Sequence, residues 1–152
     1  MKLSHFLIGA GALLLAGLVV AGGLTQSTLT GFDRAGEAPI TLADHGAAPE
    51  FRGLDGWINS APIALAETRG RVVLLDFWTY DCVNCIRTIP QLRRWHERFA
   101  ARGLVIIGVH SPEFAYEREP RRVAAAVRRL CLSYPVALDT RHTVWSDYEI
   151  QF

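Results

Sequence analysis

Apolar residues follow two alternating patterns along most of the chain. Short continuous apolar runs are typical of buried strands, and the longer segments between them repeat apolar positions with the spacing of a helix. The predicted strands span residues 71–78, 104–110 and 134–138, and the predicted helices span residues 82–101 and 119–130. Gly103 suits the end of the first helix, and Pro120 suits the first turn of the second. Alternating strands and helices predict an α/β domain with parallel strands.

The first part of the chain has a different pattern. Residues 6–24 form an apolar stretch without a charge, about as long as a helix that crosses a bilayer, and Lys2 precedes it. We therefore expect residues 1–24 to be a membrane anchor or a signal segment that exports the rest of the chain. The small residues at positions 21–23 leave cleavage open, although we favour a retained anchor. Residues 25–48 predict a linker, and residues 49–152 predict the folded domain.

Length and composition limit the architecture and the partners. The chain has 152 residues, 50% of them hydrophobic, and a net charge of +1, which suits one modest domain with an extension. This balance suggests no nucleic-acid partner. A local group of arginines alternates with valine, alanine and leucine, so we interpret it as the solvated side of an amphipathic helix. These arginines are Arg118, Arg121, Arg122, Arg128 and Arg129.

The sequence Cys82-Val83-Asn84-Cys85 follows the first predicted strand closely. Where a strand leads into a helix, free amides and the helix dipole favour a thiolate on the first cysteine. This makes Cys82 a candidate nucleophile toward a partner's disulfide. Cys85, one turn further on, is placed to resolve the mixed disulfide. Asp81 is expected to cap the helix and to oppose the thiolate, which favours a reducing role.

Other roles for this cysteine pair remain open. A structural zinc site needs further cysteine or histidine ligands at short spacing, and His96, His110 and Cys131 are isolated, so we expect no bound metal. A static disulfide between Cys82 and Cys85 is a second alternative. Cys131, near the end of the second predicted helix, is expected to be a small buried hydrophobic residue, with an exposed thiol as the alternative.

The residues around the pair resemble the thioredoxin superfamily, and within it the TlpA-like redoxins with their DipZ-type branch. The resemblance is carried by Phe-Trp-Thr-Tyr before the cysteines, Arg-Thr-Ile-Pro after them, and Gly-Val-His-Ser-Pro-Glu-Phe at positions 108–114. It covers residues 49–152. It implies a thioredoxin-like fold with a central mixed sheet flanked by helices. It also implies an irregular entry and a first short strand within residues 51–60 and 62–65.

The resemblance also assigns roles to single residues. Asp76 matches the buried acid that helps to move the proton of the resolving thiol, and desolvation should raise its pKa. Trp78 and Tyr80 are candidate substrate contacts beside the sulfurs, although Trp78 also suits a core position. Pro90 matches the proline that kinks the active-site helix. Cys82 and Cys85 would form the redox disulfide.

In the same superfamily, a proline loop, a hairpin and a last helix follow the part of the fold that this sequence reaches. The resemblance therefore implies that the C-terminal hairpin and helix are missing, so that a sheet edge is exposed. We expect one of three causes, namely a fragment of a longer product, a second chain that supplies the strands, or a decayed copy.

These observations predict a thiol-disulfide oxidoreductase tethered to the inner membrane, with its redox domain on the extracytoplasmic side. Its expected partners are protein disulfides and a membrane electron donor or recycler, and no cofactor is expected. A reductant role, for example in cytochrome c maturation, follows from the resemblance only. A truncated, non-catalytic interaction module and a thiolate metal carrier are the alternative functions.

Overall fold

The computed structural model of the chain describes residues 43–151. The predicted membrane segment and most of the predicted linker lie outside this range. Among the described residues, no helix has both the length and the apolar character needed to cross a bilayer.

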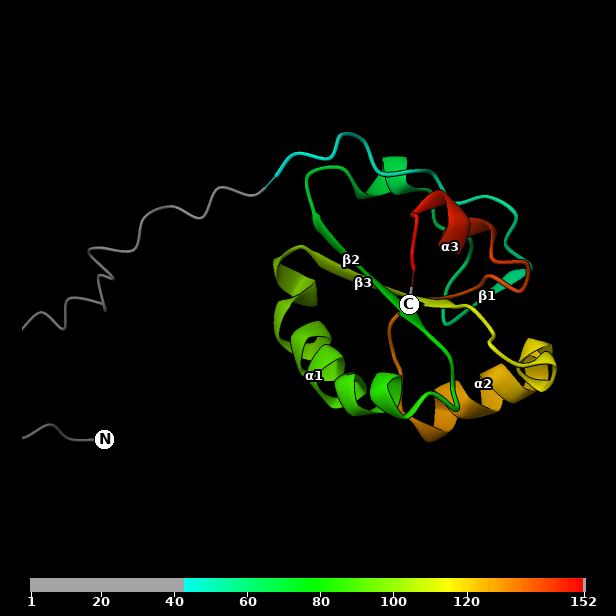
Figure 1. Cartoon of the computed structure of the whole chain (residues 1–152). Helices are drawn as coiled ribbons and strands as arrows, with labels where there is room; N and C mark the ends of the chain where they lie inside the picture. The colour runs from blue at the N-terminus through cyan, green and yellow to red at the C-terminus, as the bar shows by residue number, and fades with distance from the viewer. Residues whose placement is uncertain (1–42, 152) are drawn as a thin grey trace, which may run out of the picture. The chain divides into compact units, whose positions relative to one another are not determined.

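A four-stranded mixed sheet with the order β1-β4-β3-β2 forms the centre of the described domain (Figure 1). Its strands are β1 (Gly56–Ile58), β2 (Val72–Trp78), β3 (Leu104–His110) and β4 (Val136–Leu138). β2, β3 and β4 run parallel, as the sequence predicts, whereas β1 pairs with β4 in the antiparallel direction. In the described part of the chain, β2 has a neighbour on one side only. β2 therefore forms one edge of the described sheet, and β1 forms the other.

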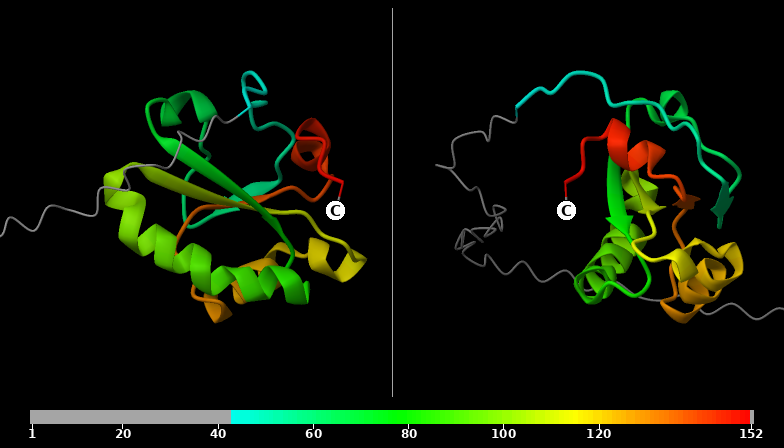
Figure 2. Two further views of the ribbon diagram at one scale, coloured as in Figure 1. Left: turned by 60° about the vertical axis from the view of Figure 1, so that its left-hand side comes forward. Right: turned by 45° about the vertical axis from the view of Figure 1, so that its right-hand side comes forward.

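Helices α1 (Val83–Phe99) and α2 (Pro120–Arg129) pack on one face of the sheet (Figure 2). Their apolar stripes meet the side chains of alternate strand residues, because successive side chains of a strand point to opposite faces. The buried residues of this core include Ile89 and Leu92 of α1, Val123 and Val127 of α2, and Ile106 of β3. The arginines of α2 face away from this core, which confirms that α2 is amphipathic.

The segment before β2 and the short helix α3 (Thr143–Asp147) cover the other face of the sheet. Ile107 and Val109 of β3 pack there against Val144 of α3 and the aromatic rings of Phe51 and Trp57. Two polar contacts hold these segments in place. Arg52 makes a two-pronged ion pair with Asp147, and the buried Asp139 accepts the backbone N–H groups of Val144 and Trp145 at 3.2 and 2.8 Å.

Three further short turns are 3₁₀ helices, namely η1 (Leu65–Thr68), η2 (Ala100–Arg102) and η3 (Ala115–Arg118). Gly103 ends η2 with a φ of 97°, the left-handed conformation that glycine adopts without strain, and Pro120 occupies the first turn of α2. Both boundary predictions are confirmed. A short strand is predicted within residues 51–60 and 62–65. β1 lies in the first of these segments, and residues 62–65 contain no strand, since the 3₁₀ helix η1 begins at Leu65.

Two sequence predictions about polar residues are wrong. Cys131 is exposed rather than buried, because α2 ends at Arg129 and Cys131 then turns away with a left-handed φ of 54°. Asp81 does not cap α1, because the N-cap residue is Cys82 itself. The Asp81 side chain instead interacts with the hydroxyl of Tyr116, and this interaction raises the pKa of Tyr116 to about 12.

Candidate active site

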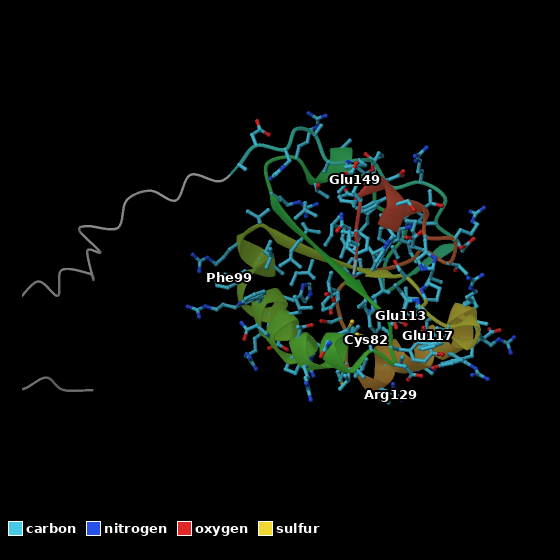
Figure 3. All side chains as sticks on the ribbon, in the orientation of Figure 1. Cys82, Phe99, Glu113, Glu117, Arg129 and Glu149 are labelled. Carbon is cyan, nitrogen blue, oxygen red and sulfur yellow. The ribbon has the colours of Figure 1, made fainter. Side chains whose placement is uncertain are left out.

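Cys82 lies where the loop after β2 enters α1 (Figure 3). Its backbone is extended, with φ −71° and ψ 111°, and its Sγ accepts the backbone N–H of Cys85 at 3.3 Å. The sulfur thus takes the place that a serine or aspartate oxygen usually takes at a helix N-cap. Both Cys82 and Cys85 are free thiols with partial exposure. A partner's disulfide can therefore reach Cys82, while the helix amide supports a negative charge on its sulfur.

Cys85 differs from its neighbour in its ionisation. Burial raises the pKa of the Cys85 thiol to about 11, and the hydrogen bond with Cys82 and the charges of Cys82 and Asp76 act in the same direction. A hydrogen bond from the Thr79 backbone partly opposes them. At neutral pH, Cys85 is consequently protonated and needs a base before it can act as a nucleophile.

Asp76 supplies an acidic group beneath the cysteine pair. Burial raises the pKa of Asp76 to about 6, as the sequence predicts for a carboxyl inside an apolar strand. Its charge influences the thiol of Cys85 and the hydroxyl of Tyr134. Gly108 is its register partner on β3, and a Cβ at that position would approach Trp78 Nε1 to 3.0 Å. The glycine therefore lets the Trp78 indole pack directly against the backbone of β3.

The two aromatic residues proposed as substrate contacts occupy different environments. Trp78 is 2% exposed and belongs to the core beneath α1 and α2. Tyr80 is also largely buried, but it lines a cavity beside the active-site loop, and its hydroxyl donates to the carbonyl of Tyr116 at 3.1 Å. Pro90 lies inside α1, which continues on both sides of it.

A buried polar cluster behind the active-site loop was not found from the sequence. Glu117 is 0% exposed, and its Oε1 accepts the hydroxyl of Thr79 at 2.6 Å. Its Oε2 accepts the backbone N–H groups of Glu113 and Phe114 at 2.8 and 2.9 Å. Burial disfavours the Glu117 charge, but the accepted hydrogen bonds outweigh burial and lower its pKa. Glu117 is therefore a fixed negative charge inside the domain (Figure 3).

Thr79 connects this cluster to both cysteines. Its carbonyl accepts the backbone N–H of Cys82 at 3.3 Å, and its backbone acts to lower the pKa of Cys85. Burial lowers the pKa of His110 to about 4, so its ring is neutral at physiological pH. His110 Nε2 lies 3.3 Å from the Thr79 hydroxyl, whose proton is directed to Glu117, so Nε2 carries the ring proton and donates it.

Comparison with known proteins agrees with this geometry. The fold and the placement of the cysteine pair are those of a thioredoxin-like domain of the redoxin branch. The family model described as "AhpC/TSA family" matches residues 45–152, and the chain belongs to this family. The resemblance noted from the sequence is thereby confirmed.

Curated relatives cover most of this chain but are longer themselves. The chain is 38% identical over 134 residues to Protein DipZ of Mycobacterium tuberculosis, a match that spans 86% of this chain and 19% of DipZ. It is 31% identical over 96 residues to the thiol-disulfide oxidoreductase ResA of Halalkalibacterium halodurans, which spans 62% of this chain and 51% of ResA.

Solved structures show the same fold. A putative thiol:disulfide interchange protein DsbE from Chlorobium tepidum aligns with a TM-score of 0.61 and 22% identity, over 73% of each chain. A thioredoxin-like protein studied in its oxidized form aligns with a TM-score of 0.63 and 21% identity, over 69% of this chain and 70% of that one. At this level of identity the likeness establishes the fold alone.

Proposed function

We propose that this chain is a thiol-disulfide oxidoreductase that acts on protein disulfides. One observation carries the proposal, namely that the partly exposed Cys82 Sγ accepts the backbone N–H of Cys85 at the N-cap of α1. This arrangement supports a nucleophilic sulfur, with a second sulfur one helical turn away. The thiol-disulfide oxidoreductase ResA, at 31% identity, supports the same class of reaction.

The first step is attack by the Cys82 thiolate on one sulfur of the partner's disulfide. The partner's S–S bond breaks, a new S–S bond joins Cys82 to the partner, and the partner's other sulfur leaves as a thiolate that takes a proton from solvent. The backbone N–H of Cys85 favours the attacking charge through its hydrogen bond to Cys82 Sγ.

In the second step, Cys85 attacks the sulfur of Cys82. Burial is the largest cause of the raised pKa of Cys85, and the hydrogen bond and the charge of Cys82 raise it further. These two contributions from Cys82 disappear once Cys82 is covalently bonded to the partner. Cys85 therefore becomes more acidic in the intermediate, and Asp76, with a pKa of about 6, accepts its proton. As the Cys82–Cys85 disulfide forms, the S–S bond between Cys82 and the partner breaks, and the partner's sulfur leaves as a thiolate that takes a proton from solvent. The partner's disulfide has then gained two electrons and two protons, and Asp76 returns its proton to solvent.

We further propose that the chain works as a reductant outside the cytoplasm, tethered by its N-terminal segment. The apolar residues 6–24 support export and tethering. The reducing direction is supported by the resemblance of the sequence to the TlpA-like redoxins. The oxidised chain would be recycled by a membrane dithiol donor.

Insulin reduction by the full chain, with dithiothreitol as the recycling dithiol, tests the proposed activity. Cys82→Ser should abolish turnover, and Cys85→Ser should accumulate a mixed disulfide with the substrate. Cys131→Ser, which changes an exposed thiol outside the site, is the matched control and should retain wild-type turnover. A folded wild-type chain without turnover would instead favour a non-catalytic interaction module.

A further inference from the structure

A cavity of about 290 Å³ lies directly beside the loop that carries Cys82. One wall is formed by Tyr80 and Asp81, the two residues before Cys82, together with Tyr116 of η3. The opposite wall is formed by α2. Asp81 lines the cavity and directly precedes Cys82 in the sequence. A partner segment that lies in the cavity would therefore be adjacent to the active-site sulfur.

The wall on α2 has a regular construction. Its members are Arg122, Ala125, Ala126 and Arg129, which have the i, i+3, i+4, i+7 spacing of one helix face. Two small alanines form the floor, and an arginine stands at each end. Arg122 and Arg129 are separated by about 10 Å along the helix axis. The remaining arginines of α2, Arg121 and Arg128, do not line the cavity.

The two arginines on this wall carry positive charges that have no acidic partner among the described residues. Among the described residues, neither Arg122 nor Arg129 forms an ion pair. The carboxylate of Asp81, on the other wall, forms no ion pair with either arginine. Both guanidinium groups therefore remain available to an anionic ligand, and arginine suits carboxylate groups in particular because of its paired donors.

An exposed aromatic residue, Tyr116, lines the same cavity, and a second one, Phe114, packs against it. Tyr116 is 43% exposed and stacks on Phe114, which is 53% exposed, with ring centroids 5.5 Å apart. Exposed aromatic rings beside arginines are the residue types that contribute most to polypeptide binding. This favours a polypeptide over a small free anion as the occupant.

We propose that this cavity docks an extended acidic segment of the partner protein, with two carboxylates about three residues apart that pair with Arg122 and Arg129. An extended chain rises about 3.3 Å per residue, so three residues match the arginine separation of about 10 Å. The inference rests on the proposed function and names its substrate class. Partners would be disulfide proteins with an acidic stretch beside the reactive cysteine.

The test compares peptides that share one intramolecular disulfide and differ in a flanking tetrapeptide, Glu-Ala-Ala-Glu, Gln-Ala-Ala-Gln or Lys-Ala-Ala-Lys. The wild-type full chain should reduce the glutamate peptide with a kcat/KM about tenfold above the lysine peptide. The double variant Arg122→Glu/Arg129→Glu should reverse this order. Arg121→Glu/Arg128→Glu makes the same charge change on the same helix outside the cavity and should preserve it.

Affinities of peptides with serine in place of cysteine, measured by fluorescence anisotropy, separate docking from chemistry. Preferential binding of the glutamate peptide without turnover would support docking and overturn the proposed function. Equal kcat/KM and affinity for all three peptides would overturn docking and leave the function standing. If the cavity variant instead lost only its binding to phosphatidylglycerol vesicles, the surface would be a membrane contact, and the peptide proposal would be wrong.

Discussion

Two carboxyl groups close to the cysteine pair, Asp76 on β2 and Glu117 on η3, have pKa values that are shifted in opposite directions. Burial raises the pKa of Asp76 to about 6. Glu117 is more completely enclosed, at 0% exposure, yet its pKa is lowered, because the hydrogen bonds that it accepts outweigh the burial. The hydrogen bonds that a carboxyl group accepts thus decide the direction of its pKa shift here.

This difference separates two tasks in the site. Glu117 holds a permanent charge that fixes the Thr79 loop, so it serves as structure. Asp76 has no hydrogen-bond donor among the described side chains and backbone groups, and its proton is held loosely enough to be exchanged near neutral pH. A carboxyl group that is stabilised by many donors would be a poor proton carrier, and one without donors would be a poor anchor.

Glu117→Ala should have the largest effect on folding. It leaves the Thr79 hydroxyl and the backbone N–H groups of Glu113 and Phe114 without their acceptor, and we expect a loss of about 3–5 kcal/mol in the free energy of unfolding. Urea unfolding followed by circular dichroism measures it. Glu113→Ala changes an exposed carboxyl in the same loop and should cost less than about 0.5 kcal/mol. Equal effects of the two substitutions would show that Glu117 is no anchor.

Asp76→Asn should increase the free energy of unfolding, whereas Glu117→Ala should decrease it. The folded pKa of about 6 lies above the ordinary value of 3.8, so folding disfavours the ionised form, and the chain loses stability as pH rises from about 3.8 to about 6. Above pH 6 this loss is constant. Removing the charge should therefore raise the free energy of unfolding by about 2–3 kcal/mol at pH 8, and by less than about 1 kcal/mol at pH 4.

The same variant separates stability from chemistry. If Asp76 accepts the proton of Cys85 as proposed, insulin reduction by Asp76→Asn should be slower than by the wild type at pH 7. Asp55→Asn, an exposed carboxyl that is 3.6 Å from Arg141, is the control and should change neither property measurably. A stability gain that persists in full at pH 4 would mean that Asp76 is not the titrating group.

The sequence allowed much of this site to be predicted, because the relevant signals are local. The apolar run before Cys82 predicts a strand, the cysteine spacing predicts a helix start, and a carboxyl within that run predicts a raised pKa. All three are found, with β2 at Val72–Trp78, α1 at Val83–Phe99 and the pKa of Asp76 raised by burial.

Glu117 could not be predicted in the same way. It stands between other charged residues, and Glu113 and Glu119 on either side of it are exposed, so no periodic pattern distinguishes it. Its burial depends on contact with Thr79, which is 38 positions away in the sequence. The exposed Cys131 was missed for a related reason, since a left-handed residue after the helix, not its composition, turns the side chain outward.

Thr79→Val removes the hydrogen bond from the Thr79 hydroxyl to Glu117 and retains the shape of the side chain. A hydrogen bond from a hydroxyl to a buried carboxylate is worth more than one to a carbonyl, so we expect a loss of about 2 kcal/mol by urea unfolding. Thr68→Val is the matched control, because the buried Thr68 hydroxyl donates to the neutral Leu65 carbonyl at 2.7 Å. Its loss should be about 1 kcal/mol. A larger loss for Thr68→Val would contradict an ionised Glu117.

Tyr134→Phe should change the free energy of unfolding least. It tests whether Asp76 has a hydrogen-bond donor in the Tyr134 hydroxyl. The Tyr134 hydroxyl is buried without a hydrogen-bond partner among the described residues, and burial, followed by the charge of Asp76, raises its pKa. An unpaired buried hydroxyl contributes nothing favourable, so its removal should leave the free energy of unfolding unchanged or raise it by up to about 1 kcal/mol. Tyr80→Phe, which loses a hydrogen bond to the Tyr116 carbonyl, should instead cost about 1 kcal/mol. A loss above about 1 kcal/mol in Tyr134→Phe would reveal a donor for Asp76, and the contrast between the two carboxyl groups would then fail.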